Sequence, residues 1–417
     1  MRIERPVYLN KLIACRYNGM IKIVTGVRRC GKSFLLSELY ADWLKTQGVQ
    51  ADRIITINLE DRRNRELRDP DVLLNFIDSK LRDDEQYYVM IDEIQHVPEF
   101  EDVLNSYLHI KNVDVYVTGS NARFLSKDVI TTFRGRGYEI KVHPLSFSEY
   151  YPVSGLSMTM ALRQHMLFGG LPQVVQLETD EQKSVFLKSL MEHTYLKDIV
   201  DRYKIRNTDV MDELLNILAS SIGGLTNPTK LANTFESVKH EKVGNKTISA
   251  YIEYLCDSFI MERATRYDIK GKKFIDSPFK YYFIDEGLRN ARLNFRQVEL
   301  PHLMENLIYN ELRIKGFNVD VGVVPIQRRL ADDRRERVQL EVDFVCNLGS
   351  RRYYIQSAYR MPDEEKFQQE EASLRYIDDS FKKIIVVGEE TPVLRTEAGT
   401  TIMSIYDFLL KENSLEL

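Results

Sequence analysis

The stretch Gly26–Ser33, with the sequence GVRRCGKS, constrains this chain most, because it fits the pattern G-x-x-x-x-G-K-[ST]. The apolar run MIKIVT leads directly into it, and the following segment spaces Phe34, Leu35, Leu39 and Trp43 close to a helical repeat. A strand, a loop bounded by glycines and a helix, in this order, favour a phosphate-binding loop at a helix N-terminus. Backbone N–H groups and the helix dipole attract an anion there.

The loop predicts a binding site for ATP and Mg²⁺. Lys32 would reach the β- and γ-phosphates, and the Ser33 hydroxyl would take one Mg²⁺ position. An ordinary strand-turn-helix junction is the alternative, but four fixed positions in this context rarely arise by chance. The predicted nucleotide-binding residues are Gly26, Val27, Arg28, Arg29, Cys30, Gly31, Lys32, Ser33 and Phe34.

The composition describes a globular chain of two to four domains, with 417 residues, 43% hydrophobic and 29% charged. A net charge of −4 denies the chain a global basic field, so any nucleic-acid contact must come from a local patch. Cys15, Cys30, Cys256 and Cys346 form no C-x-x-C pair, which argues against zinc or a disulfide framework. Without a signal-peptide core or an apolar run of bilayer length, the expectation is a cytoplasmic protein with no membrane anchor.

Two adjacent carboxylates end the apolar run YYVMIDEIQ, which predicts the second element of the nucleotide site. Asp92 would hold Mg²⁺ through water, and Glu93 stands where a general base could polarise the attacking water. A strand end with acidic turn residues is the alternative. The earlier strand-like run RIITINL also ends in carboxylates, Glu60 and Asp61.

Further candidates follow the next two strand-like runs. The run NVDVYVT breaks into a turn where Ser120, with Asn121 close behind, could meet the γ-phosphate or the water; a solvent-facing turn explains it equally well. Arg134 and Arg136 precede the run YEIKVHP and could neutralise charge on the γ-phosphoryl oxygens, in cis or across a subunit interface. Solvated or ion-paired arginines are the alternative.

The chain resembles the AAA+-related ATPases of bacteria and archaea whose C-terminal half is a restriction-endonuclease-like domain. The motifs that carry this resemblance are IKIVTGVRRCGKS, INLED, YVMIDEIQHV, VTGSNARFLS, FRGRGYEIKVHPLSFSEY, FGGLPQVV and YLKDIV. It implies an α/β fold: an AAA+-like P-loop NTPase with a parallel sheet, then a winged-helix-like segment, then a PD-(D/E)xK nuclease-like α/β domain. The expected domains are 1–150 (ATPase), 151–208 (helical connector or lid), 209–295 (winged-helix-like) and 296–417 (nuclease-like).

The winged-helix-like segment leaves its partner open. Three helix-like stretches precede two β-like runs whose tip carries Lys270, Lys272 and Lys273, a place where such domains touch DNA phosphates. The third helix carries Glu253 and Asp257, which suit a DNA groove poorly. DNA binding and a protein-protein or interdomain role therefore stand side by side.

The nuclease-like domain keeps only part of its implied metal site. Glu305 on a helix and Asp343 on a strand fit the first two places, but the E-x-K step reads Gln356, Ser357 and Ala358. An amide is a weak Mg²⁺ ligand, and Ala358 cannot position a nucleophile. The sequence therefore predicts a catalytically silent fold that serves as a docking or nucleic-acid surface.

Together these patterns predict an ATP-binding protein and Mg²⁺-dependent ATPase that couples its nucleotide state to a conformational change in a C-terminal interaction module. The alternative is an ATP-switched DNA- or protein-binding regulator with negligible turnover, and an active nuclease is less favoured. The expected partners are ATP, Mg²⁺, DNA or a protein, and further copies of the chain.

Overall fold

The computed structural model describes residues 1–119, 135–239, 242–329 and 335–417. The chain forms two compact units. The first unit comprises Met1–Leu145, Leu171–Gln176 and Asp257–Phe259, and the second unit comprises Ser146–Gly170, Leu177–Cys256 and Ile260–Leu417. Within the described ranges, no helix has both the length and the apolar character needed to cross a bilayer.

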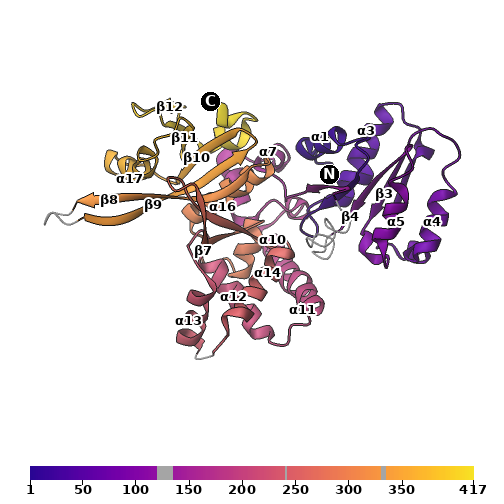
Figure 1. The fold of residues 1–417 in the computed structure, drawn as a ribbon, viewed down its shortest axis with the longest axis horizontal. Helices are drawn as coiled ribbons and strands as arrows, with labels where there is room; N and C mark the ends of the chain where they lie inside the picture. The colour runs from indigo at the N-terminus through magenta and orange to yellow at the C-terminus, as the bar shows by residue number, and fades with distance from the viewer. Residues whose placement is uncertain (120–134, 240–241, 330–334) are drawn as a thin grey trace. The chain divides into compact units, whose positions relative to one another are not determined.

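The first unit is built on a parallel five-stranded sheet in the order β2-β3-β4-β1-β5 (Figure 1). Its strands are β1 (Ile21–Thr25), β2 (Ile54–Asn58), β3 (Tyr87–Asp92), β4 (Val113–Thr118) and β5 (Gly137–Lys141). Its helical segments are α1 (Pro6–Ala14), α2 (Lys32–Phe34), η1 (Leu35–Tyr40), α3 (Ala41–Thr46), η2 (Ala51–Arg53), η3 (Arg62–Arg68), α4 (Pro70–Asp78), η4 (Ile94–His96), α5 (Phe100–Tyr107) and α9 (Pro172–Val175). All five strands follow runs that the sequence predicts.

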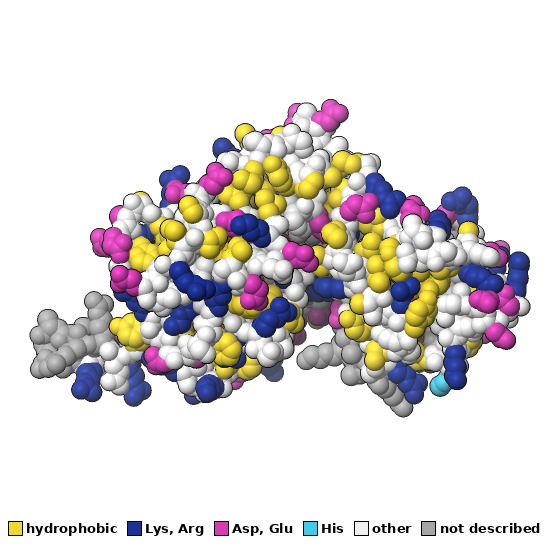
Figure 2. Space-filling model, turned by 90° about the horizontal axis from the view of Figure 1, so that it is seen from above, with side chains coloured by type: hydrophobic (Ala, Val, Ile, Leu, Met, Phe, Trp, Pro, Cys, Tyr) yellow, Lys and Arg dark blue, Asp and Glu magenta, His cyan; other side chains and the backbone are white. Residues whose placement is uncertain are grey.

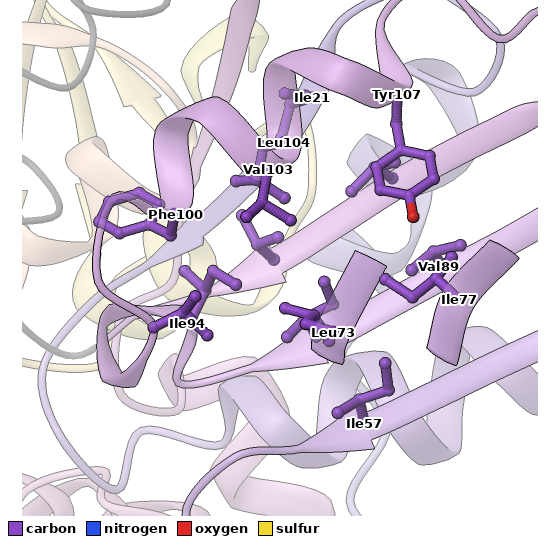
Figure 3. Packing of buried hydrophobic residues seen from close by; sticks show 14 of the residues in the cluster. Ile21, Ile57, Leu73, Ile77, Val89, Ile94, Phe100, Val103, Leu104 and Tyr107 are labelled. Atoms are coloured by element: carbon purple, nitrogen blue, oxygen red, sulfur yellow. The ribbon is translucent and has the colours of Figure 1, made fainter. Parts of the chain in front are cut away.

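One face of this sheet is covered by α4 and α5 (Figure 3). Since strand side chains alternate between faces, every second residue of β3 and β4 points to these helices. Val89, Val103 and Leu104 are buried in this contact, and the cluster also takes in Leu73 and Tyr107. This apolar layer makes the sheet a rigid platform for the loops at its carboxyl edge.

The strand residues whose side chains point to the other face of the sheet include polar groups. Lys22 of β1 forms a buried ion pair with Asp114 of β4. The Tyr116 hydroxyl donates to Asp114 Oδ2 at 2.7 Å, and the hydroxyls of Tyr40 and Tyr116 lie 2.6 Å apart. The side chains of Asp92 and Thr118 point to this same face of the sheet, because they alternate in step with Asp114 and Tyr116. This is the face on which the helix that begins at Lys32 lies.

The second unit combines helices with an eight-stranded mixed sheet in the order β12-β13-β11-β10-β9-β8-β6-β7. Its strands are β6 (Met261–Asp268), β7 (Lys273–Phe283), β8 (Asn318–Arg329), β9 (Arg335–Leu348), β10 (Arg351–Ala358), β11 (Lys382–Val387), β12 (Leu394–Arg395) and β13 (Thr401–Ser404). Its helical segments are α7 (Phe147–Ser154), α8 (Met158–Phe168), α10 (Asp180–Leu190), η6 (Met191–Leu196), α11 (Lys197–Tyr203), α12 (Thr208–Ser220), α13 (Pro228–Lys239), α14 (Asn245–Asp257), α15 (Glu286–Arg292), α16 (Leu300–Ile314), α17 (Glu364–Arg375), α18 (Ile405–Leu410) and η7 (Ser414–Glu416).

The predicted order of three helices and a hairpin appears as α12, α13, α14, β6 and β7. The hairpin does not stand apart, because β6 also pairs in parallel with β8 through Arg266–Asp268 and Val321–Val323. One sheet therefore runs across the predicted boundary at residue 295. The α/β class with a parallel P-loop-type sheet is confirmed, while the winged-helix-like and nuclease-like assignments and the four-part division stay predictions.

The glycine pair in FGGLPQVV has a packing role within the second unit. Gly170 donates its backbone N–H to Asp285 Oδ2 at 2.8 Å, and Asp285 also caps α15 by accepting from Leu288 N at 3.0 Å. A Cβ on Gly169, whose φ is +74°, would lie 2.1 Å from Asp285 Oδ1. A Cβ on Gly287 would lie 2.0 Å from the Phe168 carbonyl oxygen. Only glycines let these two backbone segments approach so closely.

Candidate nucleotide site

The phosphate loop connects β1 to α2 and is shaped by its glycines. Gly26 has a φ of +141°, and a Cβ there would lie 2.1 Å from the Val142 carbonyl oxygen. Gly31 has a φ of +98° and precedes the first turn of the helix. Arg29 also has a positive φ, of 66°, so a non-glycine residue is held in the left-handed region at the tip of the loop.

The side chains of the loop are held by its surroundings. Lys32 Nζ donates to the carbonyl oxygens of Gly26 at 3.0 Å and Val27 at 3.1 Å. Arg28 pairs with Glu60 at 3.0 Å, and Arg29 donates to the Gln173 side chain of α9 at 3.2 Å. The Lys32 ammonium group therefore folds across the loop towards neutral acceptors, from which an anion of higher charge can draw it.

Asp92 joins the loop to the sheet. Its Oδ1 accepts hydrogen bonds from the Ser33 hydroxyl at 2.9 Å and the Thr118 hydroxyl at 2.5 Å. Burial raises the pKa of the Asp92 carboxyl, and the hydrogen bonds from Thr118 and Ser33 oppose this shift. The sheet order brings the three residues together, since β4 lies between β1 and β3. Hydroxyl and carboxylate oxygens are donors that Mg²⁺ accepts, so the residues present fit the ion.

Glu93 follows Asp92 directly and turns the chain, with φ 57° and ψ 50°. Its backbone N–H donates to Thr118 Oγ1 at 3.0 Å, and its carboxylate accepts a hydrogen bond from the Gln95 amide. The carboxylate lines the same cavity as Lys32 and Ser33. The predicted roles of Asp92 as a metal ligand and of Glu93 as a general base stay predictions.

A cavity of about 450 Å³ lies over the loop within the first unit. Its lining residues are Met1, Ile3, Arg5, Arg28, Arg29, Gly31, Lys32, Ser33, Phe34, Glu60, Glu93, Leu145, Pro172, Gln173 and Gln176. The lining combines arginine and lysine side chains, the carboxylates of Glu60 and Glu93, and apolar and amide side chains. A volume of this size is typical of small-molecule sites.

The remaining predicted residues fall outside this cluster. Ser120, Asn121 and Arg134 lie outside the described residues. Arg136 is exposed, and its carbonyl oxygen accepts from Ile21 N at 2.9 Å, at the start of β1. Because β1 and β5 are parallel, this is the amino edge of the sheet, whereas the loop follows the carboxyl edge, about 16 Å further along β1.

Sequence reasoning missed several residues that hold the site. Arg5 donates to the Cys30 carbonyl oxygen at 2.9 Å and to the His143 carbonyl oxygen at 2.8 Å, which fixes the loop against the end of β5. Thr118 belongs to a β-branched run that predicts only a strand, and Gln173 follows a turn motif. The contacts of Arg5 and Gln173 span more than a hundred positions, so no local pattern could have revealed them.

The second unit brings together the two carboxylates that the nuclease resemblance implies. Glu305 on α16 and Asp343 on β9 both contact the Lys280 ammonium group, at 2.9 and 3.6 Å. Gln356 accepts a hydrogen bond from Asp343 N at 3.3 Å, and Ala358 is buried. The described residues contain no group of three or more His, Cys, Asp or Glu arranged to hold a metal ion. The nuclease motif does not predict a lysine at the place of Lys280.

Family models divide the chain into two matched regions. A model described as an AAA domain matches residues 18–151, and one described as a domain of unknown function (DUF8612) matches residues 159–299. Together with the phosphate loop and the strand order, this defines the N-terminal region as an AAA-type, P-loop ATPase-like domain.

Relatives of similar length are also found. An uncharacterized protein of Haemophilus influenzae is 31% identical over 418 residues, covering 98% of this chain and 99% of the relative. An uncharacterized protein of Methanocaldococcus jannaschii is 27% identical over 89% of this chain and 85% of the relative. This chain therefore belongs to the same protein family as the Haemophilus influenzae protein.

Two solved structures show a weak likeness. The Aeropyrum pernix ORC1 protein in complex with DNA aligns over 70% of this chain and 92% of its own, at 13% identity and a TM-score of 0.32. Protein VC1899 from Vibrio cholerae aligns over 95% of this chain and 97% of its own, at 13% identity and a TM-score of 0.21. At these scores neither likeness bears on function.

Proposed function

We propose that the chain is a Mg²⁺-dependent ATPase whose nucleotide state controls an interaction module in the second unit. The observation that carries this proposal is the double hydrogen bond to Asp92 Oδ1, from Ser33 on the loop and Thr118 on β4. It links the phosphate loop to two neighbouring strands through a single carboxylate oxygen. A change of ligand at Ser33 would thus be felt at the ends of β3 and β4.

The residues of the loop bind and orient the triphosphate in this proposal. Lys32 leaves the carbonyl oxygens of Gly26 and Val27 for the β- and γ-phosphates, while loop N–H groups surround them. Ser33 and Asp92 would hold Mg²⁺, which when bound neutralises charge on the phosphate oxygens. Ile3, Leu145 and Pro172 are apolar residues of the cavity lining, and they would suit a purine base.

Glu93 acts as the base that accepts a proton from the attacking water. The positive φ of Glu93 sends its side chain out of the strand and into the cavity, beside Lys32 and Ser33. To act on water, the carboxylate must leave the Gln95 amide. Gln95 is therefore a positioning residue that holds Glu93 between turnovers.

A switch with negligible turnover is the second candidate, and the Gln95 contact is the observation that favours it. A carboxylate already engaged by an amide polarises water less well than a carboxylate without that contact. If this contact persists with ATP bound, the chain would hold nucleotide and hydrolyse it slowly.

Turnover measured with saturating ATP separates the two candidates. A Mg²⁺-dependent rate above about 0.1 s⁻¹ that rises when DNA or cell lysate is added supports the ATPase, because typical enzymes turn over at 1–10³ s⁻¹. Tight retention of ATP with negligible release of phosphate supports the switch. Failure of ATP to bind at all would contradict both candidates.

The position of Arg136 makes self-association part of the proposal. Since Arg136 lies at the amino edge of its own sheet, it can meet a γ-phosphate only in a second copy of the chain. Turnover per chain should then rise with protein concentration, together with the mass measured by light scattering. Arg136→Ala should lower turnover more than ATP affinity, and turnover independent of concentration would contradict this role.

In this proposal the second unit binds DNA or a protein. The proposed location is the cytosol, a reducing compartment in which cysteines stay unpaired, and all four cysteines of the chain are free thiols. Figure 2 shows Lys and Arg side chains interspersed with Asp and Glu over the visible face. The visible face therefore offers no broad attraction to a polyanion, and in this proposal DNA would bind at a local basic site such as the β6–β7 tip.

A further inference from the structure

Lys280 of β7 is a buried lysine among carboxylates in the second unit, with an exposed fraction of 3%. Its Nζ lies 2.8 Å from Glu341, 2.9 Å from Glu305 and 3.6 Å from Asp343. Glu341 and Asp343 come from β9, which β8 and β6 separate from β7 in the sheet. The sheet must therefore curve enough for side chains of β7 and β9 to meet.

The carboxylates are also held by other donors. The Tyr282 hydroxyl donates to Glu305 Oε1 at 2.7 Å, and Ser357 N donates to Asp343 Oδ2 at 2.8 Å. The side chains of Glu305 and Asp343 are 12% and 11% exposed, while that of Glu341 is 35% exposed. Carboxylates this close repel one another unless a cation lies between them. The Lys280 ammonium group is that cation.

We propose that the Lys280 ammonium group occupies the place of the divalent cation in a carboxylate metal centre, and that it excludes metal from this centre. Glu305 and Asp343 are the ligands that the nuclease resemblance implies, and Glu341 also pairs with the ammonium group. With Lys280 in place, the described carboxylates are arranged around this ammonium group and not around a metal ion. Carboxylate oxygens are the donors that Mg²⁺ and Mn²⁺ prefer. The ammonium group lies within 3.6 Å of all three, so a cation cannot enter without displacing it.

This inference extends the prediction of a silent nuclease-like domain. From the sequence, the lack of nuclease activity is predicted because Gln356 and Ala358 stand where the motif has a carboxylate and a lysine. The geometry adds a second reason for this lack of activity. The remaining carboxylates already pair with a cation that belongs to the chain itself, the Lys280 ammonium group. Removing Lys280 should therefore open a cation site, even with Gln356 and Ala358 unchanged.

The test counts bound Mn²⁺ by the electron paramagnetic resonance signal of the free ion. The full chain, Lys280→Ala and the double variant Lys280→Ala/Asp343→Asn are titrated without nucleotide. Any ion at Asp92 contributes equally to all three proteins. Lys280→Ala should bind one more Mn²⁺ per chain than wild type, and the double variant should lose that ion.

Three results would overturn the proposal. The first is equal stoichiometry in wild type and Lys280→Ala. The second is an ion on wild type that Asp343→Asn alone removes, since the ammonium group would then not exclude metal. The third is a Lys280→Ala protein that aggregates on refolding both with Mn²⁺ and with EDTA. A Lys280→Ala protein that refolds with Mn²⁺ but not with EDTA would instead support the proposal.

Discussion

Lys32 in the first unit and Lys280 in the second are both buried lysines, and they differ in what surrounds the ammonium group. Lys32 donates to two neutral carbonyl oxygens, while Lys280 lies among three carboxylates. A lysine on carbonyl oxygens keeps its charge available to an incoming phosphate. A lysine on carboxylates has its charge already matched, so it holds the fold and attracts no anion. Burial alone therefore does not tell a binding lysine from a structural one.

Lys32→Ala should produce the largest loss of function. Hydrogen bonds to charged groups contribute about 1.5–3 kcal/mol each, so losing contacts to two phosphates should weaken ATP binding about 10²- to 10⁴-fold. Fluorescence titration with a labelled ATP analogue measures this affinity. Unchanged affinity would refute the assignment of the phosphate loop.

Lys280→Ala is the matched control for Lys32→Ala. It should leave ATP affinity unchanged and lower the free energy of unfolding by about 3–5 kcal/mol, because it strands buried carboxylates. Denaturant unfolding measures the second effect. Equal effects of the two substitutions on ATP affinity would remove the contrast between the lysines.

Glu93→Gln should lower kcat about 10²- to 10⁴-fold with little change in ATP affinity, because the amide cannot take a proton from water. Asp92→Asn should instead weaken the Mg²⁺-dependent part of binding, since Asp92 contacts Ser33 directly. Phosphate release and nucleotide titration distinguish the two variants. A Glu93→Gln protein with wild-type turnover would move the base to Glu60 or Asp61.

Much of the candidate nucleotide site follows from local patterns, because the loop and its helix are consecutive in the chain and Asp92 and Glu93 directly end a strand-like run. Gly26–Ser33, Asp92 and Glu93 could all be predicted in this way. Thr118 could not be singled out, since its contact with Asp92 depends on β4 lying beside β3. Lys280 could not be paired with Glu305, because their contact depends on the path of the whole second sheet.

Glu286 shows a different way to bury a carboxyl in the second unit, by protonation. Burial raises the pKa of Glu286 to about 8, with the Asp285 charge as a further cause. Its Oε1 accepts hydrogen bonds from Asn306 at 2.7 Å and Asn310 at 3.0 Å. The folded protein therefore keeps a proton that the unfolded chain releases near pH 4.5.

The free energy of unfolding should accordingly fall as pH rises from about 4.5 to about 8, by up to about 1.4 kcal/mol per pH unit, and then level off. Glu286→Gln keeps an oxygen for both asparagines and has no proton to lose. Its advantage over wild type should therefore grow across that pH range. Denaturant unfolding at pH 5, 6.5 and 8 checks this, and a constant difference would contradict the raised pKa.

The smallest effect expected is none: purified protein should not nick plasmid DNA in Mg²⁺ or Mn²⁺. The centre at Glu305 and Asp343 holds an ammonium group, and the later motif positions are Gln356 and Ala358. Gel electrophoresis of supercoiled plasmid is the measurement. Nicking that Asp343→Ala abolishes would show that Lys280 belongs to an active centre.

The pairing of β6 with β8 also has a consequence in time. Thr265 and Asp320, which share a hydrogen bond beside this pairing, are 55 positions apart. From Phe283, the last residue of β7, to Asn318, the first residue of β8, a ribosome adding about 5–20 residues per second needs about two to seven seconds. Throughout that interval the hairpin of β6 and β7 has been made, but the strand that covers the other edge of β6 has not. The nascent chain therefore presents an open strand edge to its surroundings before it can close its own sheet.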